Sequence, residues 1–124
     1  MNRPIARPII VCLCGSTRFG DAFRRANLEQ TLLGRIVLTV GCDTQSDDVL
    51  HFSPAVKDQL DELHKRKIDL ADEILVLNVY GYIGESTRSE IHYAQVHKKP
   101  VRYLEPLAEG SEELRAEYEG ETNT

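Results

Sequence analysis

The chain lacks an excess of positive charge. Its 15 Lys and Arg residues are outnumbered by 20 Asp and Glu, which gives a net charge of −5 and a pI near 5.3. A general nucleic-acid surface needs clustered Lys and Arg to neutralise phosphates, so this charge balance argues against one. No apolar run approaches the roughly 18 residues of a membrane span. Residues 1–8 carry no signal-peptide cleavage pattern. We therefore expect a cytoplasmic protein with neither nucleic acid nor membrane as a partner.

Cysteine is also scarce, with three residues in the chain. Cys12 and Cys14 alternate within a predicted strand, so both side chains point to one face. A tetrahedral metal site needs further Cys or His ligands, and Cys42 is the only other thiol. We interpret Cys12 and Cys14 as buried structural thiols, and we expect no metal site.

Apolar runs and helical periodicity alternate along the 124 residues. Parallel strands joined by right-handed helical crossovers follow from this alternation. It predicts a Rossmann-like or flavodoxin-like α/β fold, a three-layer sandwich around a four- to five-stranded parallel sheet. Residues 1–106 form one domain in this interpretation, and 107–124 form an acidic tail, with a helix expected at 111–118 and disorder at 119–124. The expected strands are 8–14, 35–40, 73–79 and 101–104, and the expected helices are 19–33, 53–71 and 87–97. The first helix has an apolar row and a cap at Gly34, and the second has Ser53 as N-cap, Pro54 at its first helical position and a row that faces the sheet. The first row is Phe23, Ala26, Leu28, Leu32 and Leu33, and the second is Val56, Leu60, His64 and Ile68.

The segment 80–94 is the most informative part of the chain. It follows a strand that reads as buried on both faces, and it delivers Ser86, Thr87 and then Glu90 to the start of a helix. Ligands bind outside the carboxyl ends of strands in open parallel sheets, so this arrangement fits a site for a polar ligand. Spacing alone favours the other interpretation, a capping box with Ser86 or Thr87 as N-cap and Glu90 or Ser89 as its reciprocal partner.

A second candidate site is the turn Gly15-Ser16-Thr17-Arg18, which connects the first strand to the first helix. Backbone N–H groups and the helix dipole favour an anion there, and Arg18 is able to clamp a phosphate. The turn matches neither the dinucleotide nor the P-loop pattern. An ordinary strand-to-helix turn with a Ser or Thr cap is the other interpretation. The long 41–53 loop is of a length that is often functional.

Together these segments resemble the nucleoside 2-deoxyribosyltransferase superfamily, which includes the deoxynucleoside 5′-monophosphate N-hydrolases. The likeness covers roughly residues 9–104 and is closest to a small branch in which the segment 81–90 is typical. The matching pieces occur in the family's order and spacing. They are the Gly15–Arg18 turn, the helix end 68–72, the Thr87-x-x-Glu90 segment, Ala94 and the strand entry at 99–101.

The resemblance implies cleavage or transfer of an N-glycosidic bond in a nucleoside or nucleoside 5′-monophosphate. Glu90 matches the catalytic glutamate, which attacks the anomeric carbon and forms a glycosyl-enzyme ester, as in retaining glycosidases. Water or a second base then takes the sugar. This chemistry requires no metal or organic cofactor. Family members complete their sites with neighbouring subunits, so we expect a homodimer or a larger homo-oligomer.

By the same alignment, Gly15 to Arg18 match the turn that holds the 5′-phosphate, and Gly84, Ser86 and Thr87 match a second phosphate-side loop. Asn78 and Tyr82 are further candidates for ligand contact, with a turn cap or loop packing as the other interpretation.

Two positions depart from the family pattern. Glu85 places a carboxylate in the second phosphate-side loop. His64 stands where the family usually has an aspartate, and it is either a hydrogen-bonded core histidine or a general acid. Asp69 is the fallback for that role. These departures motivate an alternative function, a non-catalytic nucleotide-binding or sensor module on the same fold.

Overall fold

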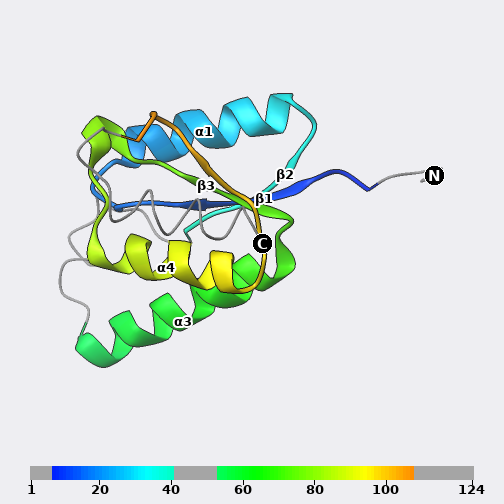
Figure 1. Cartoon of the computed structure of the whole chain (residues 1–124). Helices are drawn as coiled ribbons and strands as arrows, with labels where there is room; N and C mark the ends of the chain where they lie inside the picture. Colours follow the sequence, from blue (N-terminus) through cyan, green and yellow to red (C-terminus); the bar gives the residue numbers. More distant parts are fainter. Residues whose placement is uncertain (1–6, 41–52, 108–124) are drawn as a thin grey trace.

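The computed structural model describes residues 7–40 and 53–107. Four parallel strands form one sheet in the order β2-β1-β3-β4. Figure 1 shows α1 on one face of this sheet and α3 and α4 on the other. This is the predicted three-layer, Rossmann-like α/β sandwich. The strands are β1 Ile10–Cys14, β2 Ile36–Leu38, β3 Glu73–Val76 and β4 Val101–Tyr103, and the helices are α1 Gly20–Leu32, α3 Pro54–Leu70 and α4 Glu85–Val96.

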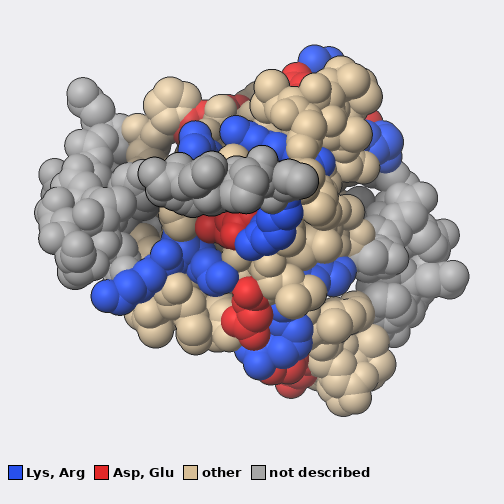
Figure 2. Space-filling view, turned by 90° about the vertical axis from the view of Figure 1, so that its right-hand side faces the viewer, with Lys and Arg blue, Asp and Glu red and all other residues tan. Residues whose placement is uncertain are grey.

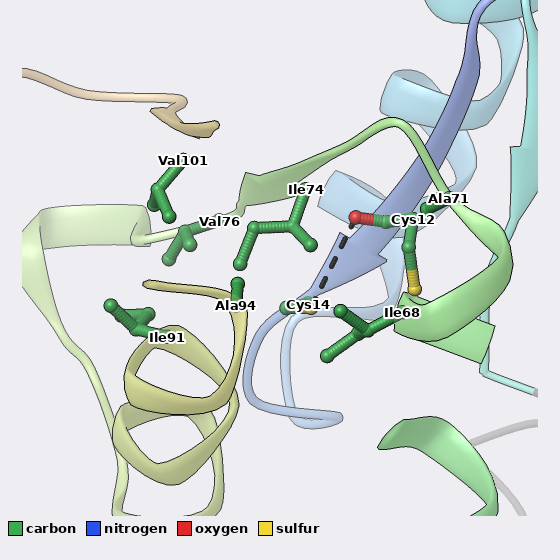
Figure 3. Close-up of a cluster of buried hydrophobic side chains, with 9 residues drawn as sticks. All are labelled: Cys12, Cys14, Ile68, Ala71, Ile74, Val76, Ile91, Ala94 and Val101. Atoms are coloured by element: carbon green, nitrogen blue, oxygen red, sulfur yellow. Dashed lines mark hydrogen bonds between the residues drawn. The ribbon is translucent and has the colours of Figure 1, made fainter. Parts of the chain in front are cut away.

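Alternate residues of β1 enter two separate cores, because successive side chains of a strand point to opposite faces. Val11 and Leu13 pack with Phe23 of α1. Cys12 and Cys14 instead pack on the side of α3 and α4, in a cluster that also contains Ile68, Ile74, Val76, Ile91 and Ala94 (Figure 3). A strand covered on both faces reads as a continuous apolar run. Each fully buried Val, Leu or Ile side chain of these cores contributes about 1.5–3 kcal/mol of hydrophobic stabilisation.

The central strand β1 extends past its neighbour β2. The β1–β2 register ends at the pair Cys12 and Leu38, whereas pairing with β3 continues to Cys14. The Ile9 carbonyl accepts a hydrogen bond from the Ile36 N–H on the β2 side, and the Cys14 carbonyl accepts one from the Leu77 N–H on the β3 side. Because carbonyl directions alternate along a strand, the Leu13 carbonyl points to the β2 side, like that of Ile9. The carbonyl of Leu13 therefore lies one residue beyond the last pair with β2, Cys12 and Leu38, and has no β2 partner in the register. This carbonyl is buried.

Several predicted helix ends are confirmed. The Ser53 hydroxyl accepts a hydrogen bond from the backbone N–H of Val56 at 3.2 Å, and Pro54 occupies the first helical position. Gly34, with φ of +85°, follows the end of α1 as expected. The predicted strand 73–79 is too long, because it ends at Val76 and a 3₁₀ turn, Val79–Gly81, follows after two residues.

The predicted apolar row of α1 is wrong in its second half. Phe23 and Ala26 are buried, but Leu28, Leu32 and Leu33 are exposed. Leucines at helical spacing in the second half of α1 therefore stay largely exposed in the described part of the chain. None of the helices within residues 7–40 and 53–107 is both long and apolar enough to cross a membrane.

The amino ends of the strands carry ion pairs. Arg7 pairs with Asp72 at 2.7 Å, and the buried Glu73 lies 3.1 Å from Arg102 and 3.5 Å from Arg35. Figure 2 views the molecule from this side and shows positive and negative side chains intermixed. Mixed charge does not favour an anionic ligand at this edge of the sheet.

Candidate functional site

Glu90 lies on the buried side of α4. The helix begins at Glu85 with Gly84 as its N-cap, two residues earlier than predicted, and no side chain caps it. The capping-box interpretation is therefore wrong, because Ser86 and Thr87 already lie inside the first turn. Thr87 and Glu90 are one turn apart and both face inward, with Glu90 only 8% exposed. The Glu90 carboxylate is thus free of a capping role.

Titratable groups from two other elements surround the Glu90 carboxylate. The Cys14 thiol of β1 and the charges of Cys12, His64 and Asp61 act on its ionisation. Burial is the largest influence and raises the pKa of Glu90 to about 7. The charge of His64 and the interaction with Cys14 oppose this rise, whereas Cys12 and Asp61 add to it. No Lys or Arg of the described chain forms an ion pair with Glu90. Both protonation states are therefore accessible near neutral pH.

His64 joins α3 to the end of β1. Its Nε2 lies 3.0 Å from the carbonyl oxygen of Leu13 and 3.5 Å from both Cys12 Sγ and Cys14 Sγ. A carbonyl only accepts hydrogen bonds, so Nε2 carries the proton in this arrangement. Like Ile68 one turn later, His64 is buried, as predicted, but Leu60 one turn earlier is exposed. Only the second half of α3 therefore faces the sheet.

The two thiols differ in proton affinity. The hydrogen bond from Cys14 lowers the pKa of Cys12 to about 6, with His64 acting in the same direction and burial opposing. The pKa of Cys14 is raised, because its proton bonds Cys12, its site is buried and Glu90 is negative. Burial lowers the pKa of His64, but the Cys12 bond and the negative charges of Cys12 and Glu90 outweigh it, so the net direction is upward. Of the two thiols beside His64, Cys12 is therefore the more acidic.

The Gly15–Arg18 turn starts directly after Cys14. A Cβ on Gly15 would lie 3.1 Å from the Leu77 Cβ and 3.2 Å from the Leu77 carbonyl oxygen, so the absence of a side chain allows the turn to lie against the end of β3. The Ser16 hydroxyl accepts a hydrogen bond from the Arg18 backbone N–H at 3.3 Å. The segment is thus a tight strand-to-helix turn, but the expected Ser or Thr cap is wrong, because Phe19 is the N-cap of α1 and no side chain caps the helix.

Tyr82 connects this turn to the loop that leads into α4. The Arg18 guanidinium lies 4.5 Å from the Tyr82 ring centroid, and its Nη2 donates to the Tyr82 hydroxyl at 3.4 Å. A Cβ on Gly84 would lie 3.2 Å from the same hydroxyl. The structure therefore brings together Arg18, Tyr82 and Gly84, three of the residues predicted to bind substrate. Within the two described ranges, Arg18 forms no ion pair with Glu85 or another carboxylate.

Lys57 of α3 is a polar residue at this edge that the sequence did not indicate. Its Nζ donates to the Ser86 hydroxyl at 2.9 Å and to Asp61 at 3.0 Å. The pair Lys57 and Asp61 has the i, i+4 spacing of countless surface pairs, so no sequence signal marks it. Cys14 was also missed as a contact of Glu90, although its placement on the inward face of β1 was available from the alternation.

Two predicted site residues have other partners. The Asn78 side chain donates to the Glu105 carbonyl and accepts from the Glu105 N–H, both at 2.9 Å, so its amide is used in fastening β4 to the end of β3. Asp69 lies just before β3 begins and accepts from the Tyr93 hydroxyl at 2.6 Å, with Arg66 at 3.3 Å. Asp69 is therefore at the amino edge of the sheet, and the structure does not bring it to Glu90.

Two further expectations concern residues that the structure does not describe. Most of the 41–53 loop and nearly all of the 107–124 tail fall outside the described residues.

The chain matches no protein-family model, no curated protein and no solved structure. The α/β fold therefore rests on the structure itself, and the superfamily remains a prediction from the sequence.

Proposed function

We propose that the protein cleaves or transfers the N-glycosidic bond of a nucleoside or nucleoside 5′-monophosphate, with Glu90 as nucleophile. The supporting observation is the buried Glu90 carboxylate, which has no described cationic ion-pair partner and sits beside the end of β1, where the Gly15–Arg18 turn begins. A carboxylate that only needs to be structural is normally paired when buried. The resemblance to the deoxyribosyltransferases supplies the reaction class.

In the proposed reaction, an ionised Glu90 oxygen forms a bond to the anomeric carbon while the carbon–nitrogen bond breaks. The bonding pair leaves with the base, which takes a proton from solvent. Water or a second base then attacks the anomeric carbon of the ester, returns a proton to solvent and releases Glu90 as a carboxylate. The Glu90 pKa of about 7 leaves a substantial ionised fraction at neutral pH. Glu90 thus needs no cofactor to reach its reactive form.

His64 has a charge role in this proposal. Its Nε2 proton is directed at the Leu13 carbonyl, which makes that proton unsuited to the leaving base. A positive imidazole near Glu90 lowers the pKa of the carboxylate and so favours the nucleophilic form. We therefore assign His64 to positioning and charge, rather than to the general-acid role that the sequence suggested.

The 5′-phosphate, where the substrate has one, is proposed to bind at the Gly15–Arg18 turn. Backbone N–H groups at the start of α1 and the Ser16 and Thr17 hydroxyls supply donors, and the Arg18 charge is uncompensated within the described chain. Tyr82 holds the guanidinium at the end of this turn. Ser86 and Thr87 belong to the facing helix start, with Ser86 held by Lys57.

The test is chromatographic detection of free base after incubation with pooled ribo- and deoxyribonucleosides and their 5′-monophosphates. Glu90→Ala is the test variant, and Glu62→Ala, an exposed glutamate on α3, is the matched control. Base released by the wild type and by the control, but not by Glu90→Ala, supports the proposal. Equal release by Glu90→Ala would remove Glu90 from the mechanism.

A non-catalytic nucleotide-binding module is the second candidate, favoured by His64 in place of the family's aspartate. Saturable stabilisation by a nucleotide that is recovered intact would support this function. Turnover above that of the Glu90→Ala variant would exclude it.

We also propose a homodimer or larger homo-oligomer. Exposed leucines on α3, Leu63 and Leu70 among them, offer an apolar surface for contact between subunits. Sedimentation equilibrium at micromolar concentration should show a species of at least twice the chain mass, and a monomer would refute it.

A further inference from the structure

We propose that Cys12, Cys14 and His64 form a binding site for a single thiophilic cation of the Zn²⁺ type. The sequence led us to interpret both cysteines as structural thiols, because no third ligand was visible near them. The fold supplies it, since α3 brings His64 over β1. All three side chains are buried.

The separation of the three ligand atoms supports this site. Cys12 Sγ, Cys14 Sγ and His64 Nε2 lie within 4.8 Å of one another, and each sulfur is 3.5 Å from Nε2. With Zn–S of about 2.3 Å and Zn–N of about 2.0–2.1 Å, tetrahedral geometry requires a sulfur–nitrogen separation of roughly 3.5 Å. Both sulfur–nitrogen separations therefore already match the separation that a bound Zn²⁺ imposes.

Hydrogen bonding alone accounts poorly for this cluster. A single N–H of His64 faces the Leu13 carbonyl and both sulfur atoms. One N–H serves one acceptor well, so the two sulfurs gain little from the imidazole. Apolar side chains at positions 12 and 14 would fill the same core without a histidine beside them. Two sulfurs and one nitrogen converging on a point are a natural ligand set for a soft or borderline cation.

Proton release follows from the binding chemistry. Both thiols bind as thiolates and so give up their protons. His64 must shift its proton from Nε2 to Nδ1, which breaks the bond to Leu13. The buried Glu90 carboxylate, which interacts with Cys14, is the neighbouring group suited to the fourth coordination position. Binding therefore releases the protons of both thiols and weakens as pH falls.

The experiment is a titration of the full, chelator-treated and reduced chain with Co²⁺, followed by competition with Zn²⁺. Tetrahedral thiolate coordination gives visible ligand-field bands and a thiolate-to-cobalt charge-transfer band. We expect both at one equivalent of Co²⁺, and their loss on adding Zn²⁺. Cys12→Ser and Cys14→Ser should each weaken the affinity by more than about 100-fold, beyond the 10- to 100-fold typical of losing an outer partner.

Cys42→Ser is the matched control, because it also removes one of the three thiols and should leave the spectrum unchanged. Circular dichroism of each variant establishes that it is folded. A folded wild type without the charge-transfer band would overturn the proposal, as would bands that persist in both Cys12→Ser and Cys14→Ser. Loss of the bands in Cys42→Ser alone would place the metal elsewhere and overturn it equally.

One consequence concerns the proposed enzyme, and it rests on the proposed function. A Glu90 carboxylate that ligates the cation cannot attack a sugar, so the metal-loaded chain should release base more slowly than the metal-free chain. The cobalt spectrum requires no turnover, so failure of the metal site and failure of the glycosidic chemistry are read from different measurements.

Discussion

Cys14 at the end of the central strand and Glu90 in the first turns of α4 interact electrostatically, so that the ionisation of each affects the other. Both groups are buried, and Cys14 lowers the pKa of Glu90 against the larger effect of burial. The carboxylate therefore remains partly protonated at neutral pH, and both the rate of base release and the stability of the fold should report its ionisation.

The rate of base release should depend on the ionisation of Glu90. The nucleophile is the ionised form, and burial raises its pKa to about 7. We expect kcat/KM, measured in the presence of a chelator, to rise with pH by roughly tenfold per unit below that pKa and to level off above it. A profile flat between pH 5 and 8 would contradict this assignment. The Cys14→Ser variant, which keeps a hydroxyl donor, should retain the rise.

Stability should fall where Glu90 ionises. A carboxyl whose folded-state pKa lies above its unfolded value stabilises the fold fully below the unfolded value, 4.5, and this contribution is lost as pH rises through about 7. A rise of that size corresponds to at most about 3 kcal/mol. The metal-free Glu90→Gln variant should therefore gain stability over the wild type between pH 5 and 8, measured by urea unfolding. The exposed Glu62→Gln is the control, and an unchanged difference across this range would contradict the expectation.

Arg18 should discriminate between nucleotides and nucleosides. Losing a charged hydrogen bond to phosphate costs about 1.5–3 kcal/mol, so Arg18→Ala should raise KM for a 5′-monophosphate by roughly 10- to 100-fold. The parent nucleoside should be little affected. Arg24→Ala, on the exposed face of α1, is the matched control. An equal effect of Arg18→Ala on both substrates would remove the phosphate from the Gly15–Arg18 turn.

Asn78 should matter for stability rather than for ligand binding. Asn78→Ala leaves the Glu105 N–H and carbonyl without their partners, which should cost about 2–4 kcal/mol in urea unfolding. Asn27→Ala on the exposed side of α1 should cost well under 1 kcal/mol. Wild-type stability together with lost substrate affinity in Asn78→Ala would contradict this prediction. That result would indicate that Asn78 contacts the ligand, as its position after β3 suggested.

The architecture was predictable because its signals are local. Continuous apolar runs at 8–14 and 73–79 indicated buried strands, and Ser53-Pro54 together with Gly34 marked helix ends that the structure confirms. Boundaries were less accurate. Periodicity did not reveal that α4 starts at Glu85, because Gly84 caps it through the backbone alone, without a side-chain hydrogen bond.

The candidate site was predictable only in part, because its contacts join residues far apart in sequence. The approach of Cys14 to Glu90 and of His64 to Leu13 depends on how α3 and α4 pack over β1, which no local pattern encodes. The same holds for Asn78, whose amide is taken up by Glu105, 27 residues later. Residue type and position at the sheet edge suggested a ligand role for it, and only the packing of the chain after β4 identified its partner.

The most direct test of the account is peptide mass spectrometry of the reaction quenched with acid during turnover of the nucleoside or nucleotide that the base-release assay identifies. The account predicts a peptide containing Glu90 whose mass is increased by one glycosyl residue, with the sugar on the Glu90 carboxyl, and no such adduct in Glu90→Gln. A sugar adduct on another side chain would contradict the central role of Glu90. So would undiminished base release by Glu90→Gln.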